Sequence, residues 1–163
     1  PSEWQKTLEV GLTGAFNVAR SVAPIMKSQG SGAIINIASN AGLMGCPNRS
    51  PYVAATWGLI GLTKTWAMEL GPHKVRVNAL CPASVEGERI EAVMARDAEE
   101  RGVSVSDIRQ SYERQSSLQS FTRVEDIASM VCYLASDAAV RISGQAIGLD
   151  GHTETLGNPL GAL

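Results

Sequence analysis

Apolar residues recur at intervals of three and four positions near the start of the chain, which predicts a helix over residues 2–28. The stripe consists of Leu8, Leu12, Ala15, Phe16, Ala19, Val22 and Ala23. The Gly-Ser-Gly sequence at residues 30–32 ends this helix. Residues 33–38 then form a short apolar run, the pattern of a strand that is buried on both faces.

The same order of helix and strand continues to the end of the chain. We expect helices over residues 52–70 and 124–136, and strands over residues 75–81 and 145–149. The last ten residues form a tail that contains Gly and Pro. Helices that alternate with short apolar strands predict an α/β fold with a parallel sheet and right-handed crossovers. No internal repeat or linker divides the chain, so it is one piece of one domain.

Residues 86–117 differ from the rest because they hold 13 of the 30 Asp, Glu, Lys and Arg residues. Ile90, Val93 and Met94 form one narrow apolar stripe, and Ile108 and Tyr112 form another. The pattern predicts two amphipathic helices that are separated at Gly102 and lie over the sheet as an insertion. Both a solvated helical pair and a mobile lid fit this pattern.

Composition narrows the classes of function. Hydrophobic residues make up 44% of the chain, charged residues 18%, and the net charge is -2, as in a soluble globular protein. No basic patch indicates nucleic-acid binding, and neither a membrane span nor a signal pattern is visible. The three cysteines, Cys46, Cys81 and Cys132, are too far apart for a disulfide framework or a metal site. We expect free thiols in a reducing cytoplasm.

Candidate chemistry lies where the predicted strands end, because open α/β sheets bind ligands beyond the carboxyl ends of their strands. Ser39 follows the first strand, residues 82–87 follow the second, and residues 150–151 follow the third. A short loop allows Tyr52 to reach the same crevice. A hydroxyl and a phenol there suit binding of a carbonyl or alcohol oxygen, although both residue types also serve as caps and in packing.

Four segments in this order resemble one family. They read GAIINIAS at 32–39, YVAATWGLIGLTK at 52–64, VRVNALCP at 75–82 and SGQAIGLDG at 143–151. Together they are similar to the core of the short-chain dehydrogenase/reductase family, over nearly the whole chain. The resemblance implies a doubly wound Rossmann domain whose last three strands are present here. It also implies hydride transfer between NAD or NADP and a small alcohol or carbonyl substrate.

The resemblance assigns roles to individual residues. Ser39 matches the serine that holds the substrate oxygen, and Tyr52 matches the general acid/base. The implied cofactor contacts are Tyr52, Pro82, Ala83 and Val85, and no metal is implied. Asn78 matches a structural asparagine that braces its strand. The charged segment 86–117 would cover a polar substrate, such as a polyol, sugar acid or hydroxy acid.

Two of the catalytic positions depart from the family pattern. The family motif is Tyr-x-x-x-Lys, but Thr56 stands four residues after Tyr52. A lysine at this spacing lies on the same helix face as the tyrosine. A cation about 4 Å from the phenolate, at an effective dielectric of about 20, stabilises the phenolate by roughly 4 kcal/mol. Thr56 lacks that charge, and Lys64 is two turns too far along to replace it. Gly11 stands where the family has an asparagine of the proton relay.

The resemblance therefore leads to two hypotheses. In the first, residues 1–163 are the C-terminal part of an oxidoreductase domain, without the glycine-rich cofactor turn that precedes this region in the family. In the second, the protein is a degenerate family member that serves oligomerisation or ligand binding. We expect a homodimer or homotetramer. The helices at 2–28 and 52–70 would form its main subunit interface, and the segment 124–149 would form the second. The strand at 33–38 would otherwise present a bare apolar edge, so the chain alone would be poorly soluble.

Overall fold

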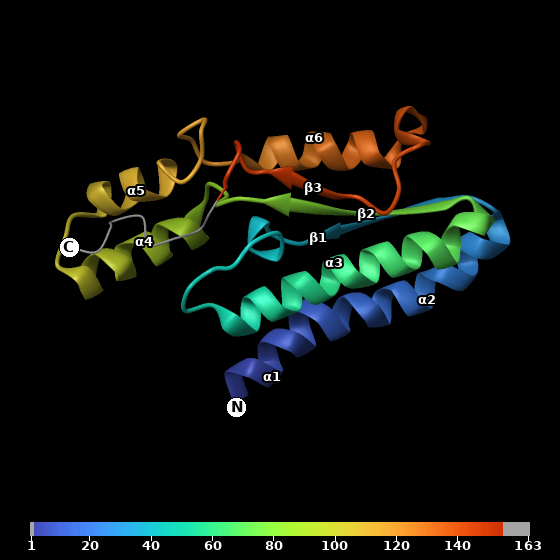
Figure 1. Ribbon diagram of the computed structural model, residues 1–163, viewed down its shortest axis with the longest axis horizontal. Helices are drawn as coiled ribbons and strands as arrows, with labels where there is room; N and C mark the ends of the chain where they lie inside the picture. The colour runs from blue at the N-terminus through green and yellow to red at the C-terminus, as the bar shows by residue number, and fades with distance from the viewer. Residues whose placement is uncertain (1, 155–163) are drawn as a thin grey trace.

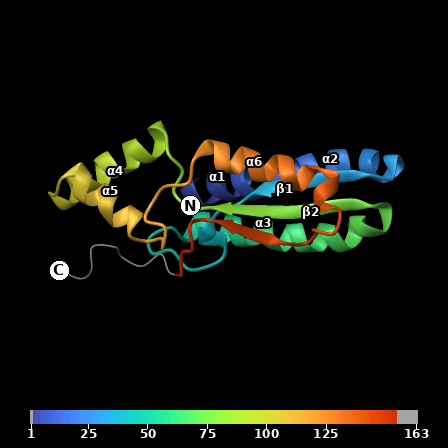
Figure 2. The same ribbon diagram turned by 90° about the horizontal axis from the view of Figure 1, so that it is seen from above.

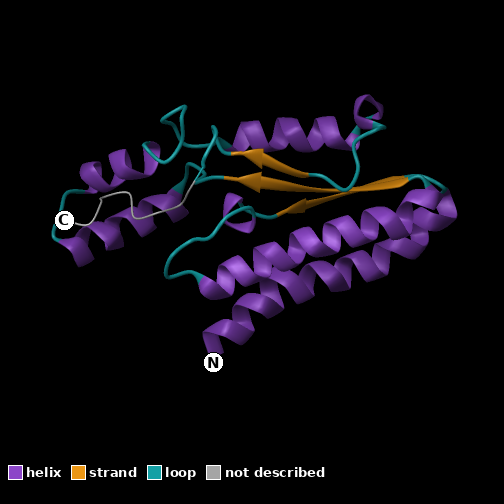
Figure 3. Ribbon diagram, viewed as in Figure 1, coloured by secondary structure: helices purple, strands orange, loops and turns teal. Residues whose placement is uncertain are grey.

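Three parallel strands form the centre of the protein, whose computed structural model describes residues 2–154. The strands lie in the order β1-β2-β3 and have the bounds β1 Gly32–Ile37, β2 Val75–Pro82 and β3 Ala146–Leu149. Figure 3 shows the three arrows pointing in the same direction. The predicted α/β fold with a parallel sheet is confirmed.

Helices cover both faces of this sheet. Helices α2 and α3 lie side by side on one face and α6 lies on the other, whereas α4 and α5 lie beyond the arrowheads of the strands (Figures 1 and 2). Their bounds are α1 Ser2–Leu8, α2 Gly14–Gln29, α3 Ser50–Leu70, α4 Glu88–Arg101, α5 Val105–Glu113 and α6 Val124–Ala135. No described helix combines the length and the apolar composition that crossing a membrane requires. Most of the predicted tail, residues 155–163, lies outside the described residues.

The helix predicted over residues 2–28 is interrupted, which corrects the sequence-based expectation of one continuous helix. A π-helical turn, Glu9–Thr13, separates α1 from α2, and the Gly14 N–H donates to the carbonyl of Glu9, five residues back. Gly11 lies inside this turn, and glycine weakens a regular helix because it adds conformational freedom to the unfolded chain. The turn lies against α3, where a Cβ placed on Gly58 would come within 2.9 Å of the Leu12 side chain.

The central strand β2 is the buried one. Val77, Ala79, Leu80 and Cys81 have no exposed surface, and Trp66 and Leu70 of α3 are buried in the same core region as Val77. By contrast, β1 is only half-buried, and Ile37 is 51% exposed. The prediction that residues 33–38 are buried on both faces is therefore wrong for the described chain, because β1 lies at the edge of the described sheet.

The side chain of Asn78 ties β2 to the segment that enters β3. Its Nδ2 donates to the Ile142 carbonyl at 2.9 Å, and its Oδ1 accepts from the Gln145 N–H at 3.1 Å. The residue is 1% exposed, so neither backbone group can exchange the amide for water at low cost. The bracing role expected for Asn78 is confirmed.

Cys81 places a thiol inside the core. Burial is the main reason why the pKa of this thiol is raised to about 11, and the Asp150 carboxylate raises it further, while a hydrogen bond with the Ser39 backbone acts in the opposite direction. Cys46 is half-buried and Cys132 is exposed, and all three thiols are free. The expectation that the cysteines form no disulfide is confirmed.

Substitution of Asn78→Ala is expected to lower the free energy of unfolding by about 2–4 kcal/mol, because two buried backbone groups lose their partners. Urea denaturation of the full-length gene product would measure this change. Asn17→Ala, on the exposed side of α2, serves as the control and should change stability by less than about 0.5 kcal/mol. Equal effects of the two substitutions would remove the bracing role from Asn78.

The Cys81 thiol is expected to resist alkylation at pH 8, because the thiolate is the reactive species and its pKa is about 11. Mass spectrometry after treatment with iodoacetamide should show modification of exposed Cys132 first and of Cys81 only in denaturant. Comparable labelling of both residues in the folded protein would mean that the end of β2 is open to solvent.

Candidate active site

The carboxyl ends of the three strands bring polar residues from distant parts of the chain to one edge. Ser39 comes two residues after β1, Pro82 ends β2, and Asp150 directly follows β3. Pro82 lies opposite Leu149 in the register, and the N–H of Ala83 donates to the Leu149 carbonyl at 3.3 Å. The sheet itself therefore positions the residues that the sequence selected at its strand ends.

Ser39 occupies this edge with an extended backbone and a buried side chain. Its Oγ accepts a hydrogen bond from the Ala41 N–H at 3.2 Å, and its O–H lies 3.4 Å from the Asn40 Oδ1. The residue thus caps the short 3₁₀ turn η2, Asn40–Gly42. One lone pair and a redirected O–H remain available for a ligand oxygen.

Tyr52 lies in the first turn of α3, and its side chain is 36% exposed. The helix begins close to the strand ends because η2 packs directly on it. A Cβ placed on Gly42 would lie 2.8 Å from the Ile60 Cδ1 and 3.2 Å from the Thr56 Cβ, so only glycine permits this contact. The turn that Ser39 caps is thereby held against α3 one helical turn after Tyr52.

Thr56 is buried and uses its hydroxyl inside α3. The Oγ1 lies 3.0 Å from the carbonyl oxygen of Tyr52 and 3.0 Å from that of Val53, so its single proton is shared between them. Such back-bonding is common for threonine in helices. Lys64 also points elsewhere, since its Nζ donates to the Gly144 carbonyl at 3.3 Å, near the amino end of β3. Neither side chain therefore places a positive charge beside Tyr52.

Gly11 lies in the π turn that packs against α3. A Cβ placed on Gly11 would be 3.4 Å from the Ala55 Cβ, an ordinary contact distance. Ala55 directly precedes Thr56, so the π turn reaches the same part of α3. The π turn therefore contacts α3 at Ala55, and neither position 11 nor position 56 carries the side chain of the family pattern.

Helix α5 reaches the same edge from the other side. A cavity of about 10 Å³ is lined by Asn40, Ala83 and Ser84 near the strand ends, by Tyr112 of α5 and by Gln115, which follows α5. Its volume suits roughly one water molecule. A larger open cleft of about 640 Å³ lies between α6 and the end of β3. Asp150 and Gly151 line it, whereas none of the predicted catalytic or cofactor-binding residues does.

The electrostatics of Tyr112 reveal a residue that the sequence analysis did not select. Burial raises the pKa of Tyr112, and the hydrogen bond that its hydroxyl donates to Asp97 at 3.0 Å raises it further, whereas the charges of Arg49 and Arg101 lower it. Arg49, three residues before Tyr52 in the sequence, is close enough for its charge to act on Tyr112. The sequence analysis missed Arg49 because a single arginine in a loop rich in Gly, Asn and Pro carries no pattern.

Val85 completes the predicted site residues. It forms a parallel bridge with Thr122, and it lies three residues beyond Pro82. Pro82, Ala83 and Val85 therefore run from the end of β2 along the edge that Ser39 occupies. Ser39, Pro82, Ala83 and Val85 follow or end strands β1 and β2, Tyr52 and Thr56 lie in α3, and Gly11 lies in the π turn.

Comparison with known proteins agrees with this arrangement. The family model described as enoyl-(acyl carrier protein) reductase matches residues 1–152. D-beta-hydroxybutyrate dehydrogenase of Rhizobium meliloti (strain 1021) is 38% identical over 150 residues, which are 91% of this chain and 58% of that protein. Trans-4-hydroxycyclohexanecarboxylate dehydrogenase of Sinomonas cyclohexanicum is 39% identical over 158 residues, which are 97% of this chain and 54% of that protein.

Solved structures show the same likeness in three dimensions. The crystal structure of NAD+-bound xylitol dehydrogenase matches with a TM-score of 0.86 and 28% identity, over 93% of this chain and 61% of that one. The chain thus spans little more than half the length of the relatives that it matches, and the prediction of a partial Rossmann fold is confirmed. The chain belongs to the short-chain dehydrogenase/reductase family and corresponds to its C-terminal portion.

Proposed function

We propose that the protein is an NAD(P)-dependent oxidoreductase that interconverts an alcohol and a carbonyl compound. The observation that carries this proposal is the placement of Ser39 and Tyr52 at the carboxyl ends of parallel strands, beside the loop that starts at Pro82. The relatives reported above are dehydrogenases of hydroxy compounds, and one is bound to NAD+. Both support the assignment.

The residues at this edge suit the nicotinamide half of the cofactor. Pro82 and Ala83 present a small, rigid surface at the end of β2, and Val85 continues it. The exposed side chain of Tyr52 can face a ligand that lies on this surface. When bound, the reduced nicotinamide supplies the hydride that adds to the carbonyl carbon.

The two hydroxyl groups act on the substrate oxygen. Ser39 donates a hydrogen bond to that oxygen and orients it, which requires its O–H to turn away from Asn40. Tyr52 donates its phenolic proton to the same oxygen as negative charge develops there, and it accepts a proton in the reverse reaction. The catalytic group is thus the phenol, and the serine is the residue that binds and orients the substrate.

A hydroxy acid is the substrate class that the site supports best. The positive charge of Arg49, three residues before Tyr52, acts on Tyr112 of α5, and this charge is a candidate partner for a substrate carboxylate. Two relatives carry hydroxy acids in their names, D-beta-hydroxybutyrate and trans-4-hydroxycyclohexanecarboxylate. In this arrangement α4 and α5 form the insertion that covers the substrate, as the charged segment 86–117 predicts.

The assembly is proposed to be a homo-oligomer in the cytoplasm, where reducing conditions keep the thiols free. The helical layer formed by α1, the π turn, α2 and α3 exposes large apolar side chains. Val10 is 73% exposed, Trp57 52% and Met68 80%. A second copy of the same layer would bury these side chains, and a two-fold axis makes such a face complementary to itself.

Thr56 and Gly11 favour a second candidate function. The hydroxyl of Thr56 is occupied by the backbone of its own helix, and Gly11 has no side chain with which to bind a water or a proton carrier. A family member in which both positions are inactive can still fold, bind ligands and pair with other subunits. This candidate differs from the first only in the rate of the chemical step, so a kinetic experiment separates them.

Substitution of Thr56→Lys is expected to raise kcat for the reduction of a keto-acid panel with NADH or NADPH at pH 7 by roughly a hundredfold, because an ammonium beside Tyr52 stabilises its phenolate. The measurement uses the protein as its gene encodes it. A second substitution, Tyr52→Phe, should abolish the gain.

Thr65→Lys is the matched control for this experiment. Its hydroxyl also bonds back within α3, to the Gly61 carbonyl at 3.0 Å, but the residue is exposed and far along the helix from Tyr52. It adds the same charge and should leave the rate unchanged. A Thr56→Lys protein that binds NADH by fluorescence but reduces no compound of the panel would support the degenerate subunit instead.

A further inference from the structure

The helices α4 and α5 are joined to the sheet by a firmly bonded base. The segment that leaves β2 pairs with the segment that returns from α5: the Glu86 N–H donates to the Thr122 carbonyl at 2.9 Å, and the Thr122 N–H donates to the Ser84 carbonyl at 3.0 Å. The Thr122 hydroxyl donates to the Leu149 carbonyl at 2.8 Å, at the end of β3. The base therefore belongs to the body of the protein, which is the sheet with the helices that cover its two faces.

The returning segment is bonded to the body over several more residues. The Ser117 N–H donates to the His152 carbonyl at 3.0 Å, and the Leu118 N–H donates to the Gly151 carbonyl at 3.1 Å. Phe121 lies within this bonded segment and is 8% exposed. The aromatic ring is consequently a fixed feature of the body rather than a part of the two helices.

The two helices pack around that ring. Met94 and Ala98 of α4, Ile108 of α5 and Phe121 form one small buried cluster. Gly87, directly before α4, has a backbone φ angle of 137°, a conformation that is open to glycine but strained for other residues. Apolar packing is non-directional, so the buried cluster does not by itself fix the orientation of the two helices.

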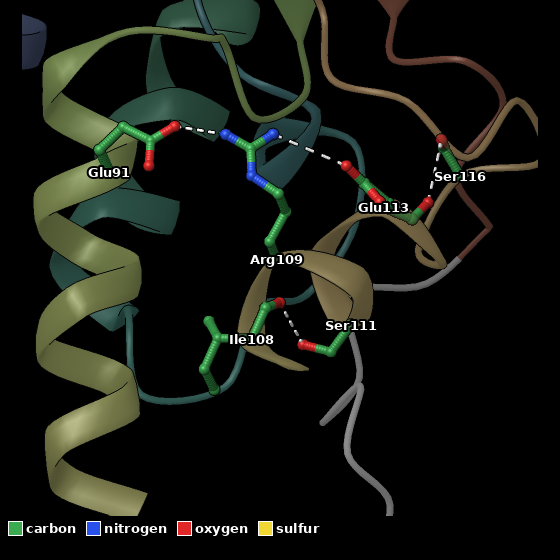
Figure 4. A network of polar contacts seen from close by, with 6 residues as sticks. All are labelled: Glu91, Ile108, Arg109, Ser111, Glu113 and Ser116. Carbon is green, nitrogen blue, oxygen red and sulfur yellow. Dashed lines mark hydrogen bonds and ion pairs between the residues drawn. The ribbon is translucent and has the colours of Figure 1, made fainter. Parts of the chain in front are cut away.

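Arg109 supplies directional contacts between the helices and the body. Its guanidinium bonds to the Glu91 carboxylate of α4 and lies 3.6 Å from a carboxylate oxygen of Glu113 in α5 (Figure 4). The same group stands 4.9 Å from the centre of the Phe121 ring. The guanidinium group is planar, so one orientation serves all three partners. One side chain thus connects α4, α5 and the fixed returning segment.

We propose that Arg109 is a positioning residue that locks α4 and α5 over the carboxyl ends of the strands. The lock acts through Tyr112 of α5 and through Gln115, two residues after the end of α5, which line the cavity at this edge together with Asn40 and Ala83. Loss of the lock lets these two side chains move away from the substrate space without touching Ser39 or Tyr52. The substrate part of this inference rests on the proposed function, whereas the mechanical part does not.

Hydrogen exchange and steady-state kinetics test the lock in the protein as its gene encodes it. In Arg109→Gln, the rate of amide exchange within α4 and α5 should rise roughly three- to tenfold, and KM for the hydroxy acid should rise by a similar factor. Both effects are limited in size because exposed ion pairs and cation–π contacts are individually modest. The kcat should stay within about twofold, because the residues at the reacting atoms are unchanged. Arg109→Lys keeps the charge but loses the planar fork, so its values should lie between those of Gln and wild type.

Two further variants make the outcome decisive. Glu91→Gln breaks only the connection to α4 and should show a smaller rise in exchange, which provides a second reading if Arg109→Gln folds poorly. Arg96→Gln removes the charge of an exposed pair with Glu100 on the same helix, 3.9 Å apart, and should behave as wild type.

Three results would overturn the inference. Unchanged exchange in both Arg109→Gln and Glu91→Gln rules out the lock, whether or not the protein is active. An equal rise in Arg96→Gln means that any lost charge loosens the helices. Faster exchange with an unchanged KM in an active protein shows that the lock exists but does not position the site. If wild type is inactive, the proposed function fails, and the exchange rates still decide the lock.

Discussion

The backbone pairing of β2 with both of its neighbours is the interaction on which the rest of the structure depends. This strand is buried almost throughout, and its register sets where the other two strands end. The Leu80 carbonyl accepts the N–H of Ala38, directly before Ser39, and Leu149 lies opposite Pro82. Any slip of β2 would therefore separate the serine from the loop that begins at Pro82. The site is a consequence of strand pairing, and its chemistry comes from side chains that the pairing leaves at one edge.

The same pairing also carries the two charged helices. Thr122 bonds to the carbonyl of Leu149, so the base of α4 and α5 is an extension of the end of β3. Beyond this base, apolar contacts around Phe121 set how close the helices come, and the contacts of Arg109 set their direction. Division of the work in this way suits a substrate cover, because a bonded base prevents unfolding while the side-chain contacts can open and close.

Much of this arrangement was predictable from sequence, and the exceptions share a physical cause. Strand and helix periods placed the parallel sheet and its helices, and the rule for strand ends selected Ser39 and Tyr52. The π turn at Gly11 was not predicted, because one added residue in a turn leaves the apolar stripe nearly intact. Phe121 was missed since it stands alone among polar residues. Arg109 was missed since two of its three partners, Glu91 and Phe121, belong to a different helix and a different segment. Contacts that depend on tertiary packing leave no periodic signal, and within the same segment the pair of Arg96 and Glu100 is indeed solvated.

Thr56 shows why membership of a family and its reaction depend on different atoms. The threonine is buried under η2, satisfies its hydroxyl on the backbone of α3 and stands in close contact with the Gly42 turn. In terms of packing it is a well-adapted helix residue, and the strands and helices around it keep the family fold. A lysine at this position would carry its charge out of the same buried location towards Tyr52, and that charge contributes to catalysis rather than to the core. Selection for stability alone therefore does not preserve a lysine at this position, because the fold and the chemistry of its site depend on different side chains.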